Sequence, residues 1–226
     1  MAVWPCCNSP VFLHFKPRAT VCITRQVTMK VLFISLLLFV SLAASQPAIT
    51  YQVNPAASQI AWTGYAEVGS YAPTGTVQIR RGSFDYDGQT LHNGRFELDM
   101  RTIEQEQAQL AEHLRGADFF DVATYPTAVF VLNEVKQGSA RGQLTIKGIR
   151  KPVEFSLTLT RQLNNGLRAK GTATIDRTQF GINHNSNRFF QNLGSYAIRD
   201  QFKLDFDVVA APVQQAVSPG GSLGKQ

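Results

Sequence analysis

The sequence predicts an all-β protein, an antiparallel up-and-down β-barrel of about eight strands with one main α-helix between strands. Runs in which apolar and polar residues alternate recur along the chain, as in strands with one buried face. Turn signals such as Asp87-Gly88 and Asn93-Gly94 join neighbouring runs. One stretch, residues 102–116, has helical spacing instead. Closing such a meander into a barrel removes its exposed edges, and a β-sandwich is the alternative.

The first expected strands are short. Residues 49–53 alternate and stop at Asn54-Pro55, and the alternation resumes at Ile60 and Trp62. A later run, before the helix, places three apolar residues on one face and acidic residues between them: Phe96, Leu98 and Met100.

A β-bulge is expected in the strand between these runs. Val77 and Ile79 lie on one face, whereas Phe84 and Tyr86 have the opposite parity. One extra residue near Arg81-Gly82 restores a single apolar face, which is what a β-bulge does.

The helical stretch carries recognisable end signals. Thr102 and Gln105 are spaced as a capping box, and Gly116 suits the C-terminal end. Apolar residues at helical spacing lie between them: Ala108, Leu110, Ala111 and Leu114.

Strands resume after Pro126 and continue to residue 208. Small residues at 169, 171 and 173 either leave space on an inner face or let another element approach closely. Residues 181–199 break the alternation. This Asn-rich stretch, which carries Phe189 and Phe190, is a candidate lid or pocket wall.

The two ends of the chain differ from its middle. Residues 31–44 are an apolar run too short to cross a bilayer comfortably, with Lys30 before it and small residues after it. Residues 1–45 are therefore expected to be a leader, with a signal peptide at 29–45 and a mis-assigned extension at 1–28. A membrane anchor is the alternative. Residues 46–211 form the barrel domain, and 212–226 form a disordered tail. A signal peptide implies a periplasmic or secreted protein.

Removal of the leader changes the composition. All three cysteines precede the apolar run, so the remaining chain has no disulfide and no thiolate. Four basic residues are lost with it, which leaves 18 basic against 16 acidic side chains, a net charge of +2. The sequence pI of about 9.4 therefore does not indicate a nucleic-acid partner.

No catalytic residue, metal site or cofactor is predicted, a bound lipid apart. His92, His113 and His184 are not spaced as metal ligands, and no Gly-x-Ser-x-Gly elbow occurs. Asp176-Arg177 is read as a structural pair at a strand end, although an arginine there can also bind a head group. Asp118 and Asp121 are expected to cap turns.

Several segments together resemble the YceI-like family of exported proteins. They include Asp118-Phe119-Phe120-Asp121-Val122 with Tyr125-Pro126, Leu144-Thr145-Ile146-Lys147-Gly148, Ile175-Asp176-Arg177 and Phe180-Gly181-Ile182. The resemblance extends from about Tyr51 to Val209. It implies a lipocalin-like barrel with an interior tunnel that binds polyisoprenoid lipids, isoprenoid quinones among them, or fatty acids and their amides. The 183–194 loop departs from the family pattern, so no particular lipid is carried over.

The inward apolar residues and two loop aromatics are the candidate ligand-binding set, although each inward residue can equally be core filling. The set is Trp62, Phe84, Phe96, Leu98, Phe130, Leu132, Leu144, Ile146, Phe155, Leu157, Ile175, Phe189, Phe190, Phe202 and Phe206.

The function expected is that of a carrier that sequesters an isoprenoid-type lipid or a long acyl chain. One alternative is an envelope protein with a filled barrel and an interaction role. Another is an enzyme acting on an apolar substrate, which needs an inward acid or base, whereas Glu97, Asp99 and Glu154 are expected to face outward. Transient membrane contact is compatible with a carrier, and the oligomeric state is left open, a homodimer included.

Overall fold

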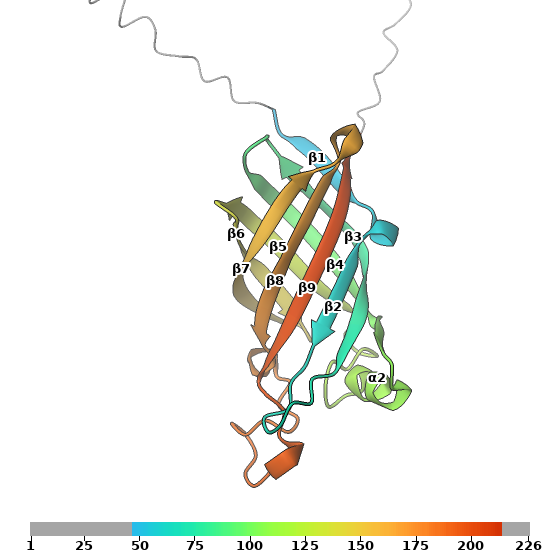
Figure 1. Ribbon diagram of the computed structural model, residues 1–226, viewed down its shortest axis with the longest axis vertical. Coiled ribbons are helices and arrows are strands. Elements are labelled where there is room, and N and C mark those ends of the chain that lie inside the picture. Colours follow the sequence, from blue (N-terminus) through green and yellow to red (C-terminus); the bar gives the residue numbers. More distant parts are fainter. Residues whose placement is uncertain (1–46, 214–226) are drawn as a thin grey trace, which may run out of the picture. The chain divides into compact units, whose positions relative to one another are not determined.

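The computed structural model describes residues 47–213, which form an antiparallel sheet closed into a barrel (Figure 1). Its strands are β1 (Ile49–Val53), β2 (Gln59–Thr63), β3 (Thr74–Tyr86), β4 (Leu91–Gln105), β5 (Thr127–Lys136), β6 (Ser139–Ile146), β7 (Ile149–Arg161), β8 (Leu167–Asp176) and β9 (Gln201–Pro212). Strands β3 to β9 pair in sequence order, and β9 pairs with β1 and β2, which both pair with β3. Because β1 and β2 share one position, the barrel has eight positions, and the predicted fold is confirmed.

A short 3₁₀ turn, Pro55–Ala57, separates β1 from β2. Asn54 Oδ1 accepts hydrogen bonds from the N–H groups of Ala56 and Ala57 at 3.1 and 3.3 Å. Ser58 Oγ donates to Asn54 O at 2.7 Å and accepts from the Val209 N–H at 3.0 Å. The Asn54-Pro55 signal thus marks a local turn inside one position of the barrel, since both flanking strands keep the same neighbours.

The predicted bulge in β3 is confirmed. The register between β3 and β4 shifts between Ile79 and Arg81, and both Ile79 and Phe84 are buried despite their opposite parity. Two further register shifts flank it in the same strand pair. Bulges increase local bend and twist, so the bulge in this pair helps the sheet to close.

The predicted start of the helix is wrong. Helix α2 spans Ala108–Arg115 and has no side-chain cap, while β4 continues through both residues of the expected capping box. Thr102 Oγ1 accepts a hydrogen bond from the Gln78 N–H at 2.9 Å, and Gln105 pairs with β3. Cross-strand pairing therefore overrides the local capping signal. At the other end, the Gly116 N–H donates to carbonyls of the last turn, as predicted.

Aromatic rings fill one end of the barrel. Successive centroids in a chain of six rings lie 5.3 to 6.2 Å apart, and the rings are those of Tyr51, Phe84, Phe96, Phe130, Phe155 and Phe206. Glycines make room for them: a Cβ on Gly142 would lie 2.5 Å from the Phe130 ring, and one on Gly171 would lie 2.5 Å from that of Phe206. Of the two predictions for residues 169–173, close approach holds at Gly171.

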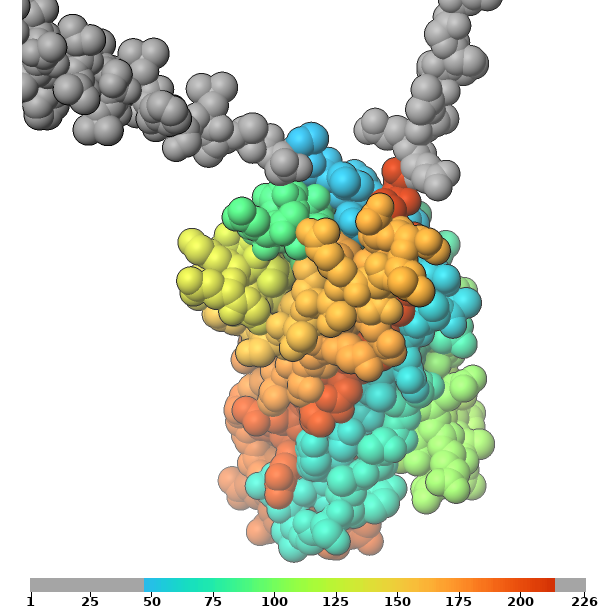
Figure 2. Space-filling view, turned by 45° about the horizontal axis from the view of Figure 1, so that its top comes forward, coloured from blue at the N-terminus to red at the C-terminus, as the bar shows by residue number. Residues whose placement is uncertain are grey.

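Turns cover this aromatic end (Figure 2). The Tyr51 hydroxyl donates to the Asn165 carbonyl at 3.1 Å, which ties β1 to the β7–β8 turn. Figure 2 brings this end forward, with the β3–β4, β5–β6 and β7–β8 turns in green, yellow and amber around β1. In Figure 1, α2 and the loops that follow β2 and β8 lie at the opposite end.

The predicted ends of the domain fall at the limits of what the structure describes. Strand β9 ends at Pro212. The expected leader, 1–45, and all but the first two residues of the expected tail lie outside the described residues. Within residues 47–213, no helix is long and apolar enough to cross a bilayer.

Candidate functional site

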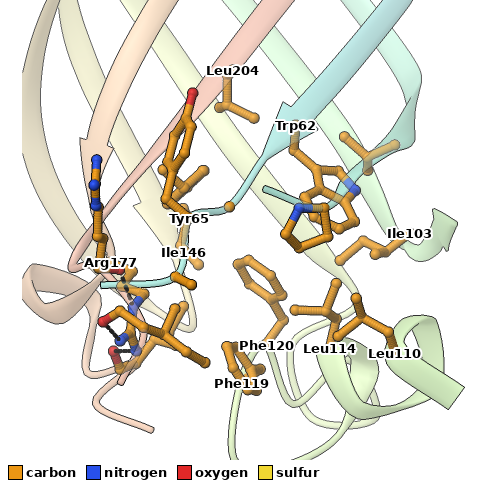
Figure 3. Close-up of a pocket in the computed structure, with 18 of the residues that line it drawn as sticks. Trp62, Tyr65, Ile103, Leu110, Leu114, Phe119, Phe120, Ile146, Arg177 and Leu204 are labelled. Atoms are coloured by element: carbon orange, nitrogen blue, oxygen red, sulfur yellow. Dashed lines mark hydrogen bonds between the residues drawn. The ribbon is translucent and has the colours of Figure 1, made fainter. Parts of the chain in front are cut away.

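The larger of two cavities, about 270 Å³, lies at the end of the barrel that carries α2. Its wall combines strand residues with the β2–β3 loop, the helix and its following turn, and residues 182–199. Figure 3 shows Phe119 and Phe120 beside α2, with Trp62 and Tyr65 on the other side of the space. Tyr71 and Tyr196 line the cavity while more than half of each residue is exposed, so the cavity reaches the surface between their loops.

The smaller cavity, about 130 Å³, lies among the aromatic rings deeper in the barrel. All of its lining residues are apolar, and they include the predicted inner positions Ala169 and Ala173. Leu98, Leu144 and Leu204 border both cavities. These leucines separate the two spaces, which follow one another along the interior. A change of leucine rotamer would connect them.

Thirteen of the fifteen predicted site residues line one or both cavities. The larger cavity takes Trp62, Leu98, Leu144, Ile146 and Phe202, and the smaller takes Phe84, Phe96, Leu98, Phe130, Leu132, Leu144, Phe155, Leu157, Ile175 and Phe206. Phe189 and Phe190 line neither, and about half of each is exposed. Both N–H groups donate to the Ser186 carbonyl in a local turn that directs these rings away from the interior.

Other lining residues were not in the predicted set. Leu204 has the same parity as Phe202 and Phe206, so strand alternation alone indicates it. Strand alternation also indicates Val77 and Met100, and helical spacing indicates Leu110 and Leu114. No periodic signal identifies the lining residues on irregular loops: Tyr65, Tyr71, Phe119, Phe120, Ile182, Tyr196 and Ile198.

Arg177 holds residues 182–199 against the barrel. Only 4% of this residue is exposed. Its guanidinium donates to the carbonyls of Arg199, Ile182, His184 and Ile198 at 3.1, 2.9, 2.8 and 3.0 Å. Burial lowers the pKa of Arg177, whereas Asp200 and Asp176 raise it. The structural reading of Asp176-Arg177 is confirmed, since these bonds account for most of the five donors of the arginine.

Asp176 completes this arrangement. Its carboxylate accepts from the N–H and hydroxyl of Thr178 at 2.9 and 2.6 Å and pairs with Arg188 at 3.3 Å. The same Arg188 pairs with Asp200 at 3.4 Å. Burial raises the pKa of Asp176, but the hydrogen bonds from Thr178 and the charge of Arg188 outweigh it, so the net shift is downward. Both termini of the segment are thus anchored by charged groups.

Three rings join the helix to the same segment. His113 of α2, Phe119 and His184 lie with centroids 4.9 to 5.1 Å apart. Burial lowers the pKa of His184, the nearby His113 and Arg177 lower it further, and Asp118 opposes them. The neutral form of His184 is therefore favoured where the two walls of the cavity meet.

Acidic side chains lie outside both cavities. Glu97 faces outward beneath Arg81 and Arg95, with Arg81 Nε 2.7 Å from its carboxylate, and hydrogen bonds from these arginines lower the pKa of Glu97 against the effect of burial. The linings of the two cavities contain no Asp, Glu, His or Cys. In residues 47–213, no three such side chains are grouped closely enough to hold a metal ion. The wall therefore supplies apolar surface and a few neutral or cationic polar groups.

Trp62 carries the polar atom at this site that lacks a partner. Its indole N–H is buried and has no acceptor among residues 47–213. Buried donors are normally paired, so an unpaired one beside a cavity is a candidate ligand contact.

Comparison with known proteins identifies the family to which this chain is similar. The family model described as a YceI-like domain matches residues 51–210. A UPF0312 protein of Pseudomonas putida strain F1 is 32% identical over 120 residues, 48% of this chain and 62% of the relative. Another from Pseudomonas paraeruginosa strain PA7 is 34% identical over 112 residues, 45% of this chain and 59% of the relative. The chain thus matches about three fifths of the length of these relatives.

Two solved structures share the fold. Burkholderia cenocepacia BcnA has a TM-score of 0.55 and 21% identity, over 70% of this chain and 99% of that chain. A structure described as a polyisoprenoid binding domain from Saccharophagus degradans implicated in plant cell wall breakdown has a TM-score of 0.55 and 13% identity, over 73% and 99%. At these identities the likeness concerns the barrel alone.

Proposed function

The chain belongs to the YceI-like family, and from this premise we propose that it is an exported carrier that holds an isoprenoid-type lipid or a long acyl chain inside its barrel. The observation that carries the proposal is the interior itself. A cavity of about 270 Å³ opens at one end, and a second, wholly apolar cavity continues beyond three shared leucines. A packed barrel interior would have left no such space.

Apolar walls suit a ligand without many polar groups. Removing apolar surface from water stabilises a complex by about 25 cal/mol per Å², so a hydrocarbon chain needs area rather than hydrogen bonds. We assign the chain to the interior and the head group to the mouth, near Tyr65 and Ser195, where the lining becomes polar. The indole N–H of Trp62 is then available to an oxygen of the ligand.

The cavity volumes bear on ligand length. Ligand pockets usually measure roughly 300–1,000 Å³. Each of the two spaces, about 270 and about 130 Å³, is below that range, and only the two together reach its lower end. A chain that fills both must displace Leu98, Leu144 or Leu204. The isoprenoid class is favoured by analogy with the Saccharophagus degradans domain, which shares the fold.

The two other expected functions have less support. A filled barrel with only an interaction role does not agree with the cavities. Acid–base catalysis needs a titratable group within reach of the substrate, and neither cavity lining includes a carboxylate or a histidine. Export is proposed from the apolar run and small residues of 29–45, with a periplasmic or secreted location.

Mass spectrometry of an organic extract tests the proposal. The full chain is expressed in a bacterial host, purified without detergent and extracted. We expect an isoprenoid or acyl species in stoichiometric amount. An empty extract, together with no binding of farnesol or a dansyl-labelled undecanoic acid by the folded protein, would contradict a carrier function.

A pair of variants locates the site. Leu144→Trp places an indole between the two cavities, whereas Thr145→Trp adds the same group to the outer face of the same strand. We expect Leu144→Trp to weaken binding of the dansyl probe at least about tenfold, since most of the apolar contact area is lost. Thr145→Trp should bind it like the wild type.

A further inference from the structure

Six large apolar residues at the open end of the barrel are exposed, five of them on loops and turns and Ile149 at the start of β7. Their exposed fractions are 63% for Val68, 57% for Tyr71, 38% for Ile149, 51% for Phe189, 49% for Phe190 and 77% for Tyr196. We call these six the mouth collar. In the described part of the chain, the other exposed large apolar residues, Ile49, Leu163 and Val213, lie at the opposite end.

The mouth collar is held in place by backbone hydrogen bonds. An antiparallel bridge joins Ala66 to Ile198, with Glu67 N–H donating to Ala197 O at 2.9 Å. The N–H groups of Phe189 and Phe190 donate to the carbonyl of Ser186, which is fully buried. The adjacent rings of Phe189 and Phe190 are therefore presented to solvent by an anchored backbone, and exposed apolar groups that lie together mark interaction sites.

Two of the stretches that carry the mouth collar are positively charged, whereas the β2–β3 loop, which carries Val68 and Tyr71, includes Glu67. Residues 147–151 include Lys147, Arg150 and Lys151, residues 181–199 include Arg188 and Arg199, and neither stretch has an acidic residue. Arg188 is paired with Asp176 and Asp200, whereas Arg150, Lys151 and Arg199 form no ion pair with a described residue. Exposed cations beside apolar rings are complementary to a surface of anionic lipid head groups.

The mouth collar is continuous with the larger cavity. Tyr71 and Tyr196 belong to both, so part of the mouth collar is itself a wall of the cavity. Tyrosine is enriched at membrane–water interfaces, where its ring lies among acyl chains and its hydroxyl among head groups.

We propose that the mouth collar docks the barrel on a lipid bilayer, with Phe189 and Phe190 inserted at the interface and the cavity opening directed at the acyl chains. A lipid then passes between bilayer and cavity without crossing water. That transfer rests on the proposed carrier function, whereas docking does not.

Vesicle flotation tests docking. The full chain is mixed with vesicles of phosphatidylethanolamine and phosphatidylglycerol, and the floated fraction is measured for wild type, the Phe189→Ser/Phe190→Ser double variant and a Leu163→Ser control. Leu163 is 91% exposed but lies at the other end. We expect the double variant to bind vesicles at least about tenfold more weakly, since two buried rings are lost. The control should match the wild type.

Solution binding separates docking from the carrier function. The double variant should bind the dansyl-labelled undecanoic acid normally, because neither ring lines a cavity. Leu144→Trp should lose that probe yet still float with vesicles. Normal flotation of the double variant, equal loss in the Leu163→Ser control, or no wild-type flotation would each overturn docking. So would a wild-type dimer in light scattering that the double variant abolishes, which would assign the mouth collar to a second copy of the chain.

Discussion

The two ends of the barrel share one wall and differ in what fills them. At the closed end, six aromatic rings in successive contact lie against glycines and leave about 130 Å³ empty. At the open end, strand residues of the same wall face loops and a helix, and about 270 Å³ stays empty. Rings lying against glycines leave the smaller space, whereas loops held by hydrogen bonds and ion pairs bridge the larger one. The comparison assigns stability mainly to the closed end and ligand access to the open end.

Removing a ring from the closed end should have the largest effect. Phe84 is buried and stacks on Tyr51 at 5.4 Å and on Phe96 at 6.2 Å. We expect Phe84→Ala to lower the free energy of unfolding by about 3–5 kcal/mol, because the loss of a buried ring enlarges the cavity that it lines. The enlarged inner space should also admit longer acyl chains.

Chemical denaturation measures the loss in free energy of unfolding. Binding of alcohols of increasing chain length measures whether the variant admits longer chains. Leu163→Ala, at an exposed position, is the control and should stay within about 0.5 kcal/mol of wild type. A loss of less than about 1 kcal/mol for Phe84→Ala would mean that the closed end does not carry the stability.

Removing the anchor of the open end should have the next largest effect. Arg177→Met leaves four carbonyl groups without their donor, and we expect a loss of about 2–4 kcal/mol in the free energy of unfolding. Hydrogen exchange should show lost protection in residues 182–198, with the strands of the closed end protected as before. Arg177→Lys keeps the charge without the planar guanidinium, so its free energy of unfolding should lie between those of the wild type and Arg177→Met. Uniform loss of protection would show that the two ends unfold as one unit.

A charge on the outer wall gives a smaller effect at low pH. Hydrogen bonds from Arg168 at 2.7 and 2.6 Å, and Lys170 at 2.9 Å, lower the pKa of Asp207 from 3.8 to about 2. Because the folded-state pKa lies below the unfolded value, its stabilisation is complete above pH 3.8 and is lost as pH falls through about 2.

After allowance for solvent screening of a partly exposed pair, we expect Asp207→Asn to cost about 0.5–1 kcal/mol near neutral pH. Unfolding titrations of both proteins should converge toward pH 2. A difference independent of pH would mean that packing rather than charge is responsible.

The smallest expected effect is a pH dependence of stability near neutral pH, and it arises at the open end from His184. Burial, His113 and Arg177 lower the pKa of His184 below its ordinary 6.5, against the opposing charge of Asp118. The unfolded chain then binds more protons than the folded one just below that value, so stability falls as pH drops from about 7 toward 5. His184→Gln should reduce this dependence in pH-resolved unfolding. If the pH dependence of stability were unchanged in this variant, another titratable group would be responsible for it.

Local pattern was sufficient for the barrel and much of its lining. Alternation with period two decides which strand residues face inward whatever their partners, so Phe130 and Leu144 could be placed from sequence. The parity change between Ile79 and Phe84 likewise required a bulge. The start of α2 could not be placed, because β4 extends by pairing with a strand some 20 to 30 residues earlier in the chain.

The sequence by itself determined the antiparallel barrel, many of its inward residues and the structural role of Asp176 and Arg177. Only the tertiary structure decided that the larger empty space lies at one end, that Phe189 and Phe190 are exposed, and that His113 meets His184. These outcomes depend on contacts between segments distant along the chain. The volume left inside a barrel is set by how rings and loops from many strands pack together, and no local periodicity encodes that sum.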